Sequence, residues 1–152
     1  MISLARDIFE GAREASFELY RHDLRYNAME ARALSLGGAA DVRVASGGIA
    51  DRTRAVDAMV DYEALMERKA ERWCEAIDRA VRVLYGDDWE HGIAAGLSMS
   101  HAEVLDCIYI QRMSIKATAQ RVHWSDRKVC DLRREAFVYI DMVGEQAAVA
   151  GE

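Results

Sequence analysis

A regular three-four spacing of apolar and small side chains runs along residues 51–85 and constrains the fold more than any other feature of the sequence. The spacing persists for about four heptads, which is typical of a coiled coil, and only Glu63 interrupts it. The stripe consists of Val56, Met59, Met66, Ala70, Trp73, Ile77, Ala80 and Leu84. We therefore expect one helix from about Asp51 to Tyr85, roughly 50 Å long.

A second stripe of the same kind predicts a helix from about Ser3 to Leu34. Its members are Leu4, Ile8, Ala12, Ala15, Leu19, Tyr26, Met29 and Ala33. The chain contains no proline, so no residue forces a kink in either helix. Residues 35–50 contain two Gly-Gly pairs and predict a loop. We expect residues 1–86 to form an antiparallel helical hairpin that serves oligomerisation or partner binding.

Shorter helical segments follow. Gly86 suits the left-handed position that ends a helix, and residues 91–97 read as a linker. A serine, Ser98 or Ser100, is expected to cap the next helix, and Ser100 with Glu103 matches a capping box. The expected buried face of that helix is Val104, Leu105, Ile108 and Tyr109. Residues 147–152 are predicted to be a frayed tail.

Residues 113–134 predict a helix-turn-helix inside a module spanning residues 98–145. Two short amphipathic helices can be drawn there, joined by a tight turn at His123-Trp124 and with Ser125 capping the second. Helices that cross steeply need a small residue at the crossing and apolar anchors opposite it. Ala119 is that small residue; the anchors are Val122, Val129 and Leu132. The predicted fold class is all-α: a long N-terminal helical hairpin followed by a C-terminal helix-turn-helix module.

This window is also strongly basic. It carries seven Lys or Arg against two acids between Arg112 and Arg134, in a chain whose net charge is −6. A local basic surface is the electrostatic signature of nucleic-acid binding. Arg127 and Lys128 fall in the first turn of the second helix, which approaches base edges when such a helix enters a major groove. Ser125 and Asp131 share their exposed face. Four further cations are placed to bind phosphates: Lys116, Arg121, Arg133 and Arg134.

From about Ser100 to Ile140 the chain resembles the fourth conserved region of bacterial sigma factors. The pattern can be laid on the chain from Glu103 without a gap. The matching positions are Val104, Leu105, Cys107, Tyr109, Ile110, Met113, Ser114, Ala119, Val122, Trp124, Ser125 and Val129. The chain departs from the pattern at Arg112 and His123, where glycine is common, and at Thr118, where isoleucine is common. The resemblance implies a helix-turn-helix that binds DNA.

The whole layout is similar to phage and prophage late-gene transcriptional activators of the ArpU and RinA-like group. That resemblance implies a small cytoplasmic transcription regulator without a catalytic site. Its expected partners are double-stranded DNA and RNA polymerase. A homodimer is also expected, because the apolar stripes that pair two helices within one chain can equally pair two chains.

Other classes of protein find little support in the sequence. No apolar run is long enough to span a membrane, and the N-terminus does not read as a signal peptide. The three cysteines are widely spaced and odd in number, which favours reduced thiols in a cytosolic protein. Their spacing to the histidines matches no zinc site. No phosphate-binding glycine loop occurs. We expect no enzymatic activity, no metal and no cofactor.

Two alternatives remain open at this stage. The first is a phage terminase small subunit, which also joins a helix-turn-helix to helical oligomerisation elements but usually places the DNA module first. The second is a helical interaction factor that contacts RNA polymerase without binding DNA, which the net charge of −6 allows.

Overall fold

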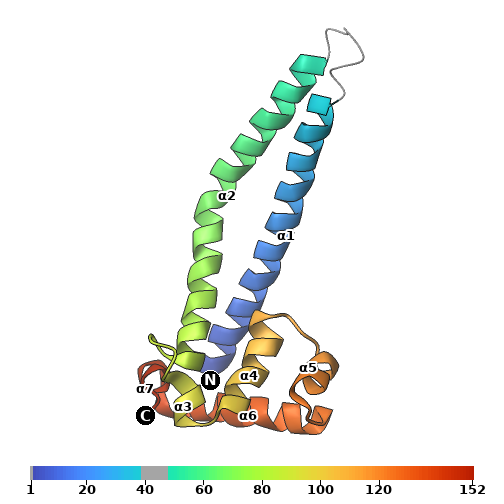
Figure 1. Cartoon of the computed structure of the whole chain (residues 1–152). Coiled ribbons are helices and arrows are strands. Elements are labelled where there is room, and N and C mark those ends of the chain that lie inside the picture. The colour runs from blue at the N-terminus through green and yellow to red at the C-terminus, as the bar shows by residue number, and fades with distance from the viewer. Residues whose placement is uncertain (1, 39–47) are drawn as a thin grey trace. The chain divides into compact units, whose positions relative to one another are not determined.

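A computed structural model of the chain describes residues 2–38 and 48–152, and the described residues form helices and no strand (Figure 1). Two long antiparallel helices, α1 (Leu4–Gly38) and α2 (Gly48–Tyr85), come first. The shorter elements that follow are α3 (Gly92–Gly96), α4 (Met99–Leu105), the π-helical turn η2 (Asp106–Ile110), α5 (Ile115–Val122), α6 (Asp126–Val143) and α7 (Glu145–Ala150). The all-α prediction is confirmed.

Both long helices extend into the segment predicted to be a loop. α1 continues past Leu34 to Gly38, and α2 begins at Gly48 rather than near Asp51. Each glycine lowers helix stability by about 1 kcal/mol relative to alanine. Elongating an existing helix nevertheless avoids the nucleation cost and adds a hydrogen bond per residue. Residues 39–47, the rest of the predicted loop, lie outside the described residues.

The chain divides into two compact units. One comprises the residues up to Phe17 together with Trp73–Glu152, and the other comprises Glu18–Arg72. Each unit therefore contains part of α1 and part of α2. The division falls at residues 17 and 73 rather than at residue 86, because the first turns of α1 pack with the C-terminal helices.

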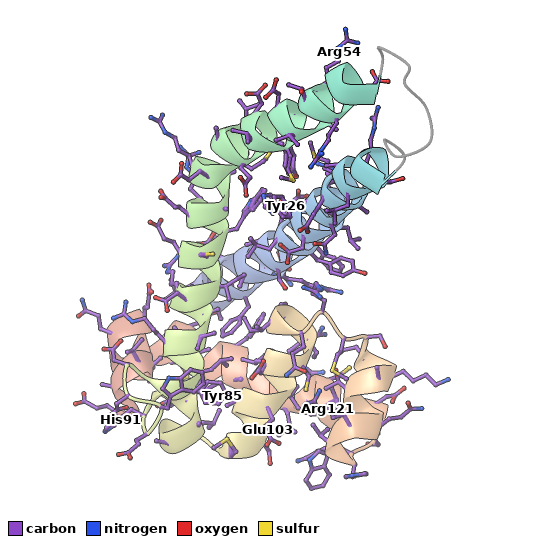
Figure 2. The ribbon with its side chains drawn as sticks, turned by 45° about the horizontal axis from the view of Figure 1, so that its top comes forward. Tyr26, Arg54, Tyr85, His91, Glu103 and Arg121 are labelled. Atoms are coloured by element: carbon purple, nitrogen blue, oxygen red, sulfur yellow. The ribbon has the colours of Figure 1, made fainter. Side chains whose placement is uncertain are left out.

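In the unit Glu18–Arg72, the seam of α2 differs from the predicted one at two positions. Tyr62 is half-buried and stacks on His22, with ring centroids 5.2 Å apart, whereas Glu63 and Val56 are exposed. The Tyr62 ring can thus fill the seam while the Glu63 carboxylate stays solvated. Tyr26 lies between the two helices (Figure 2), and the nearby Glu63 carboxylate raises the pKa of its hydroxyl, chiefly through its charge.

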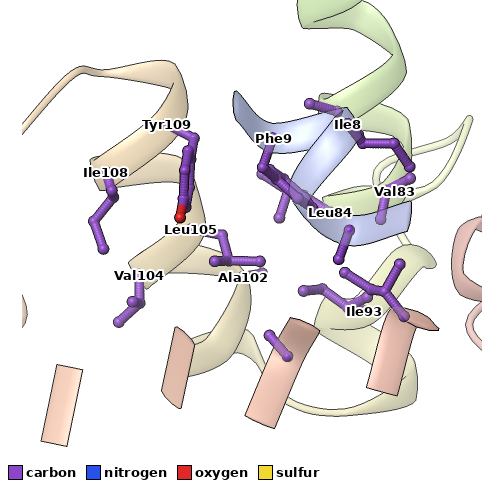
Figure 3. Packing of buried hydrophobic residues seen from close by; sticks show 14 of the residues in the cluster. Ile8, Phe9, Val83, Leu84, Ile93, Ala102, Val104, Leu105, Ile108 and Tyr109 are labelled. Atoms are coloured by element: carbon purple, nitrogen blue, oxygen red, sulfur yellow. The ribbon is translucent and has the colours of Figure 1, made fainter. Parts of the chain in front are cut away.

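The core of the larger unit is centred on Phe9, which is fully buried. Its ring lies 5.6 Å from that of Tyr109 and 5.8 Å from that of Phe137, measured between centroids. Ile8 and Phe9 of α1 meet Val83 and Leu84 of α2 and the helices from α3 onward in a single cluster (Figure 3). The face predicted to be buried is confirmed at each position: Val104, Leu105, Ile108 and Tyr109.

The N-terminus of α1 is capped by a side chain from α6. The Asp141 carboxylate accepts hydrogen bonds from the Ala5 backbone N–H (2.8 Å) and from the Ser3 hydroxyl (2.6 Å). A carboxylate satisfies the unpaired N–H groups of a first helical turn and interacts favourably with the helix dipole. This contact links the start of α1 to the last turn of α6. It adds polar contacts to the apolar packing of Phe9 in the same unit.

Of the two serines predicted as alternative caps of α4, one is confirmed, and two other local predictions in the C-terminal half were wrong. Ser98, not Ser100, caps α4: its extended backbone lets its hydroxyl accept from the His101 N–H (3.3 Å). The expected linker at residues 91–97 contains α3. The expected frayed tail is α7, because Arg79 holds Glu145 through two hydrogen bonds of 2.8 and 2.7 Å. The left-handed conformation expected at Gly86 is confirmed, with φ of 77°.

The first prediction concerns Phe9. Phe9→Ala should lower the free energy of unfolding by about 3–5 kcal/mol, because it removes a fully buried aromatic side chain and leaves a cavity. Urea unfolding followed by circular dichroism measures this loss. Met142→Ala is the control, since the Met142 side chain is 79% exposed. A loss no larger than that of the control would contradict the central place of Phe9.

The second prediction concerns Thr118, which is fully buried and whose hydroxyl has no hydrogen-bond partner. Thr118→Val should raise the free energy of unfolding by about 1 kcal/mol, because a methyl group replaces an unsatisfied polar group at nearly the same volume. Thr118→Ser keeps the hydroxyl and loses the methyl, so it should lower stability instead. Equal unfolding midpoints for the two variants would refute the reasoning.

Candidate nucleic-acid interface

Each helix of the helix-turn-helix begins at a serine cap. The Ser114 hydroxyl accepts a hydrogen bond from the Ala117 N–H at the start of α5 (3.1 Å), and the Ser125 hydroxyl accepts from the Lys128 N–H at the start of α6 (3.1 Å). The cap predicted at Ser125 is confirmed. These caps fix where each helix begins, and therefore which side chains occupy the first turn of α6.

The turn between the two helices is made by a left-handed residue. His123 has φ 60° and ψ 38°, and the Trp124 N–H donates to the Ala119 carbonyl (3.1 Å), which closes the end of α5. Histidine thus adopts the conformation for which glycine is the usual residue. The turn predicted at His123-Trp124 is confirmed.

A second left-handed residue precedes α5. Arg112 has φ 59°, so the chain is left-handed at both positions where the sigma-factor pattern carries glycine. The Arg112 guanidinium donates to the Ser16 carbonyl (3.0 Å) and hydroxyl (2.9 Å), and the Ser16 hydroxyl donates to the Ile110 carbonyl (2.8 Å). We call these three contacts the Ser16 latch. It ties the segment before α5 to α1.

The inner face of the helix-turn-helix is as the sequence predicted. Val129 is 0% exposed, Leu132 3% and Ala119 5%, and all three belong to the core of the larger unit. Val122 is half-buried against the same core. With these side chains inside, helical periodicity directs the polar positions of both helices outward.

Most of the predicted DNA-binding side chains lie on that outer surface. The exposed ones are Lys116, Arg121, Ser125, Arg127, Lys128 and Arg134. Asp131 and Arg133 are half-buried. Six of the eight predicted positions are thus accessible, and they lie on α5, on α6 and at the cap of α6.

Three of the predicted arginines already contact other residues of the chain. Arg134 pairs with Asp131 (3.6 Å), and Arg121 donates to the Gln111 side-chain oxygen (2.7 Å). Arg133 is turned toward Tyr109, whose pKa is raised by burial and lowered by the Arg133 charge.

The first turn of α6 is more available. Arg127 has no hydrogen bond or ion pair with any described residue, and the Lys128 ammonium lies 5.8 Å from the centre of the Trp124 ring. Trp124 is 47% exposed. Two cations and an indole therefore stand at the N-terminus of α6, where the helix dipole attracts anionic groups.

Two hollows lie outside this surface. A cleft of about 260 Å³ is lined by Tyr85, Glu103, Asp106, Cys107, Gln111, Arg121 and Val122 (Figure 2 labels Tyr85, Glu103 and Arg121). Burial raises the pKa of both the Tyr85 hydroxyl and the Cys107 thiol, so neither is activated as a nucleophile.

A larger groove of about 730 Å³ lies along α2 and α7. Its charged groups already bind one another: Arg79 with Glu145, Arg82 with Asp87, and His91 with Asp88. Within residues 2–38 and 48–152, no three potential metal ligands come together. None of the described helices is both long enough and apolar enough to cross a membrane.

Comparison with protein-family models, curated proteins and solved structures finds no match to this chain. The resemblance to sigma factors and to phage late-gene activators therefore stays a prediction. Neither the Ser16 latch nor the inward contact of Arg133 could be read from the sequence, because each depends on a residue far away in the chain.

The third prediction tests the left-handed turn. His123→Gly should raise the free energy of unfolding by roughly 0.5–1 kcal/mol, because glycine adopts this conformation without the strain of a side chain. Arg112→Gly relieves the same kind of strain but removes the hydrogen bonds to Ser16, so we expect it to lower stability. Denaturant midpoints measure both changes. A destabilised His123→Gly variant would show that the histidine side chain makes a contribution larger than the strain.

Proposed function

We propose that this chain is a DNA-binding transcription regulator whose α5–α6 surface enters the major groove. The observation that carries the proposal is the first turn of α6, where Arg127 and Lys128 are exposed beside a capped helix N-terminus. The inner face of the same two helices is fixed in the core at Ala119, Val129 and Leu132. A rigid support with outward cations is what recognition of base edges needs.

The cations of this surface have different expected roles. Arg127 and Lys128 would contact base edges, since an arginine can donate two hydrogen bonds to guanine. Lys116 and Arg121 on α5 would contact phosphates, which position a protein on the duplex but carry little sequence information. Arg133 and Asp131 support the surface rather than touch DNA, because both are half-buried.

The finer proposal is activation of phage late genes in the bacterial cytoplasm. Its support is the resemblance of residues 100–140 to the fourth sigma-factor region and the left-handed backbone at Arg112 and His123. Both residues stand where that pattern has glycine. The left-handed conformation that glycine commonly adopts is therefore kept at these two positions, although the residues are arginine and histidine. RNA polymerase would then be the second partner.

A factor that binds RNA polymerase without DNA is the second candidate. It is favoured by the net charge of −6 and by Glu103 and Asp106, whose acidic cleft lies next to Arg121 on α5. A pull-down of RNA polymerase with and without duplex DNA separates the two functions. A terminase small subunit would instead assemble as a ring of many subunits, which a mass measurement in solution detects.

The fourth prediction tests DNA binding with a library of random-sequence duplexes. The logarithm of the binding constant should fall linearly with the logarithm of salt concentration, with a slope of roughly −0.9 for each phosphate contacted. Lys116→Ala and Arg121→Ala should each weaken binding to all sequences and make the slope shallower by about 1. Arg127→Ala should relax the sequence preference found by selection from the library and sequencing.

Arg6→Ala serves as the control, because Arg6 is an exposed arginine of α1 outside the helix-turn-helix. It should change neither the slope nor the sequence preference. Binding that does not respond to salt, or an equal response to Arg6→Ala and Lys116→Ala, would refute the proposed interface.

A further inference from the structure

Trp124 is an exposed aromatic residue that the packing of the core does not explain. Its side chain is 47% exposed, and it is absent from the described side chains that form or line the core of the larger unit. Its backbone is nevertheless fixed, because its N–H donates to the Ala119 carbonyl (3.1 Å) and the next residue, Ser125, caps α6. The indole is therefore held just before the first turn of α6, with much of its surface in solvent.

The Lys128 ammonium lies over the Trp124 ring, 5.8 Å from its centre. That distance is within the range of a cation–π interaction, which is strongest with tryptophan. The Lys128 backbone is fixed by the same cap, since its N–H donates to the Ser125 hydroxyl (3.1 Å). Among the described residues, the Lys128 ammonium has neither a hydrogen bond nor an ion pair. The Trp124 ring therefore restrains an ammonium that is otherwise unpaired in this part of the chain.

Lys128 stands at a helix position where a cation is unfavourable. It is the third residue of α6 after the Ser125 cap, where glutamate or glutamine would complete a capping box and interact well with the helix dipole. Arg127 adds a second cation to the same turn, and Asp126 is its one acid. Residues that break a local rule of this kind are expected at functional sites. A duplex would offset the unfavourable charges, because it offers both phosphates and the acceptor atoms of guanine.

A carboxylate further along α6 competes for the Lys128 ammonium. Glu135 is exposed and lies seven residues after Lys128, which is two turns on and nearly the same side of the helix. The pKa of Glu135 is lowered mainly by its hydrogen bond with His101 and to a smaller extent by the charge of Lys128. The lysine stem is long and flexible, so without the ring the ammonium is free to turn toward Glu135. Trp124 opposes that movement away from the start of α6.

We propose that Trp124 is a positioning residue for DNA recognition: its ring holds the Lys128 ammonium at the start of α6, where the ammonium donates to guanine in the major groove. This inference rests on the proposed function and adds to it the residue that directs Lys128 and the base that Lys128 reads. A lysine donates to the O6 and N7 atoms of guanine. A restrained ammonium favours one base position, because less side-chain freedom is lost on binding and fewer phosphates are within its reach.

The first experiment tests the contact in the free protein by proton NMR. The terminal methylene protons of Lys128 should resonate upfield of those of Lys116, because they lie over an aromatic ring. Trp124→Phe should keep part of this shift and Trp124→Leu should remove it, since leucine has no π face. Lys128→Ala and Lys116→Ala assign the two signals. Coincident signals for the two lysines overturn the proposal without any experiment on DNA.

The second experiment measures discrimination between duplexes. Selection from a random library identifies the preferred site, and Lys128→Ala identifies the base pair that Lys128 reads as the one at which preference is lost. We expect that base pair to contain guanine, so an A·T pair in its place should weaken binding by the wild type. Trp124→Leu should reduce this discrimination about two- to fivefold, the equivalent of about 0.5–1 kcal/mol for an exposed cation–π contact. Trp124→Phe should retain more of it, because the ring is kept.

A double-mutant cycle separates positioning from a structural role. Because Trp124 acts through Lys128, Trp124→Leu should have no further effect on discrimination in a chain that carries Lys128→Ala. Lys116→Ala is the matched control, since Lys116 lies at the opposite end of α5 from Trp124. The effects of Trp124→Leu and Lys116→Ala on binding should add. Circular dichroism and urea unfolding check that each variant keeps its fold.

The outcomes distinguish the two proposals. A wild type that shows no salt-dependent binding to duplex DNA overturns the proposed function and the role of Trp124 together. A wild type that binds DNA, with Trp124→Leu as discriminating as the unchanged chain, overturns the role of Trp124 alone. Equal effects of the leucine and phenylalanine variants, or additive effects of Trp124→Leu and Lys128→Ala, do the same.

Discussion

The burial of Phe9 is the constraint on which the larger unit depends. Its ring stacks on that of Phe137 from α6 and meets at a tilt the ring of Tyr109 from the segment before α5. The helices from α3 onward are short, and α3, α4 and α5 each have fewer than ten residues. Helices of that length are marginal on their own and take most of their stability from packing. The first turns of α1 supply the apolar surface against which they assemble.

The same packing explains why the candidate interface is rigid. Ala119, Val129 and Leu132 are held in the core, and the Ser16 latch fixes the backbone just before α5. Serine caps at Ser114 and Ser125 determine the first residue of each helix. The exposed cations are thus presented on a support whose position is set from the inside. A surface of this kind can select among sequences, whereas cations on a frayed helix would bind phosphates indiscriminately.

The local features of the fold could be predicted because they depend on spacing alone. The two long helices follow from their apolar stripes, and the turn at His123 and the cap at Ser125 follow from residues within one or two turns of each other. The missed features share a different origin. α7 depends on Arg79 and Glu145, and the Ser16 latch on Ser16 and Arg112; these partners are 66 and 96 positions apart. Such pairs leave no local pattern in a single sequence.

The prediction of site residues shows the same limit. Periodicity placed Arg127, Lys128 and Lys116 outside correctly, because their neighbours on each helix were clearly apolar. Arg133 was assigned to the phosphate contacts, yet it is half-buried and directed to Tyr109. An arginine at the edge of a helix face can turn either way, since its long stem tolerates burial. Its direction is decided by a partner on another helix.

The contact between Asp141 and the N-terminus of α1 has a consequence for how the protein is made. The hydrogen-bonded residues, Ala5 and Asp141, are 136 positions apart. A ribosome adds about 5–20 residues per second, so the beginning of α1 waits many seconds before its partners exist. During that interval the apolar side of its first turns can meet Val83 and Leu84 of α2 but still lacks Tyr109 and Phe137. The nascent polypeptide is therefore more vulnerable to aggregation, and more in need of chaperones, until α6 has been synthesised.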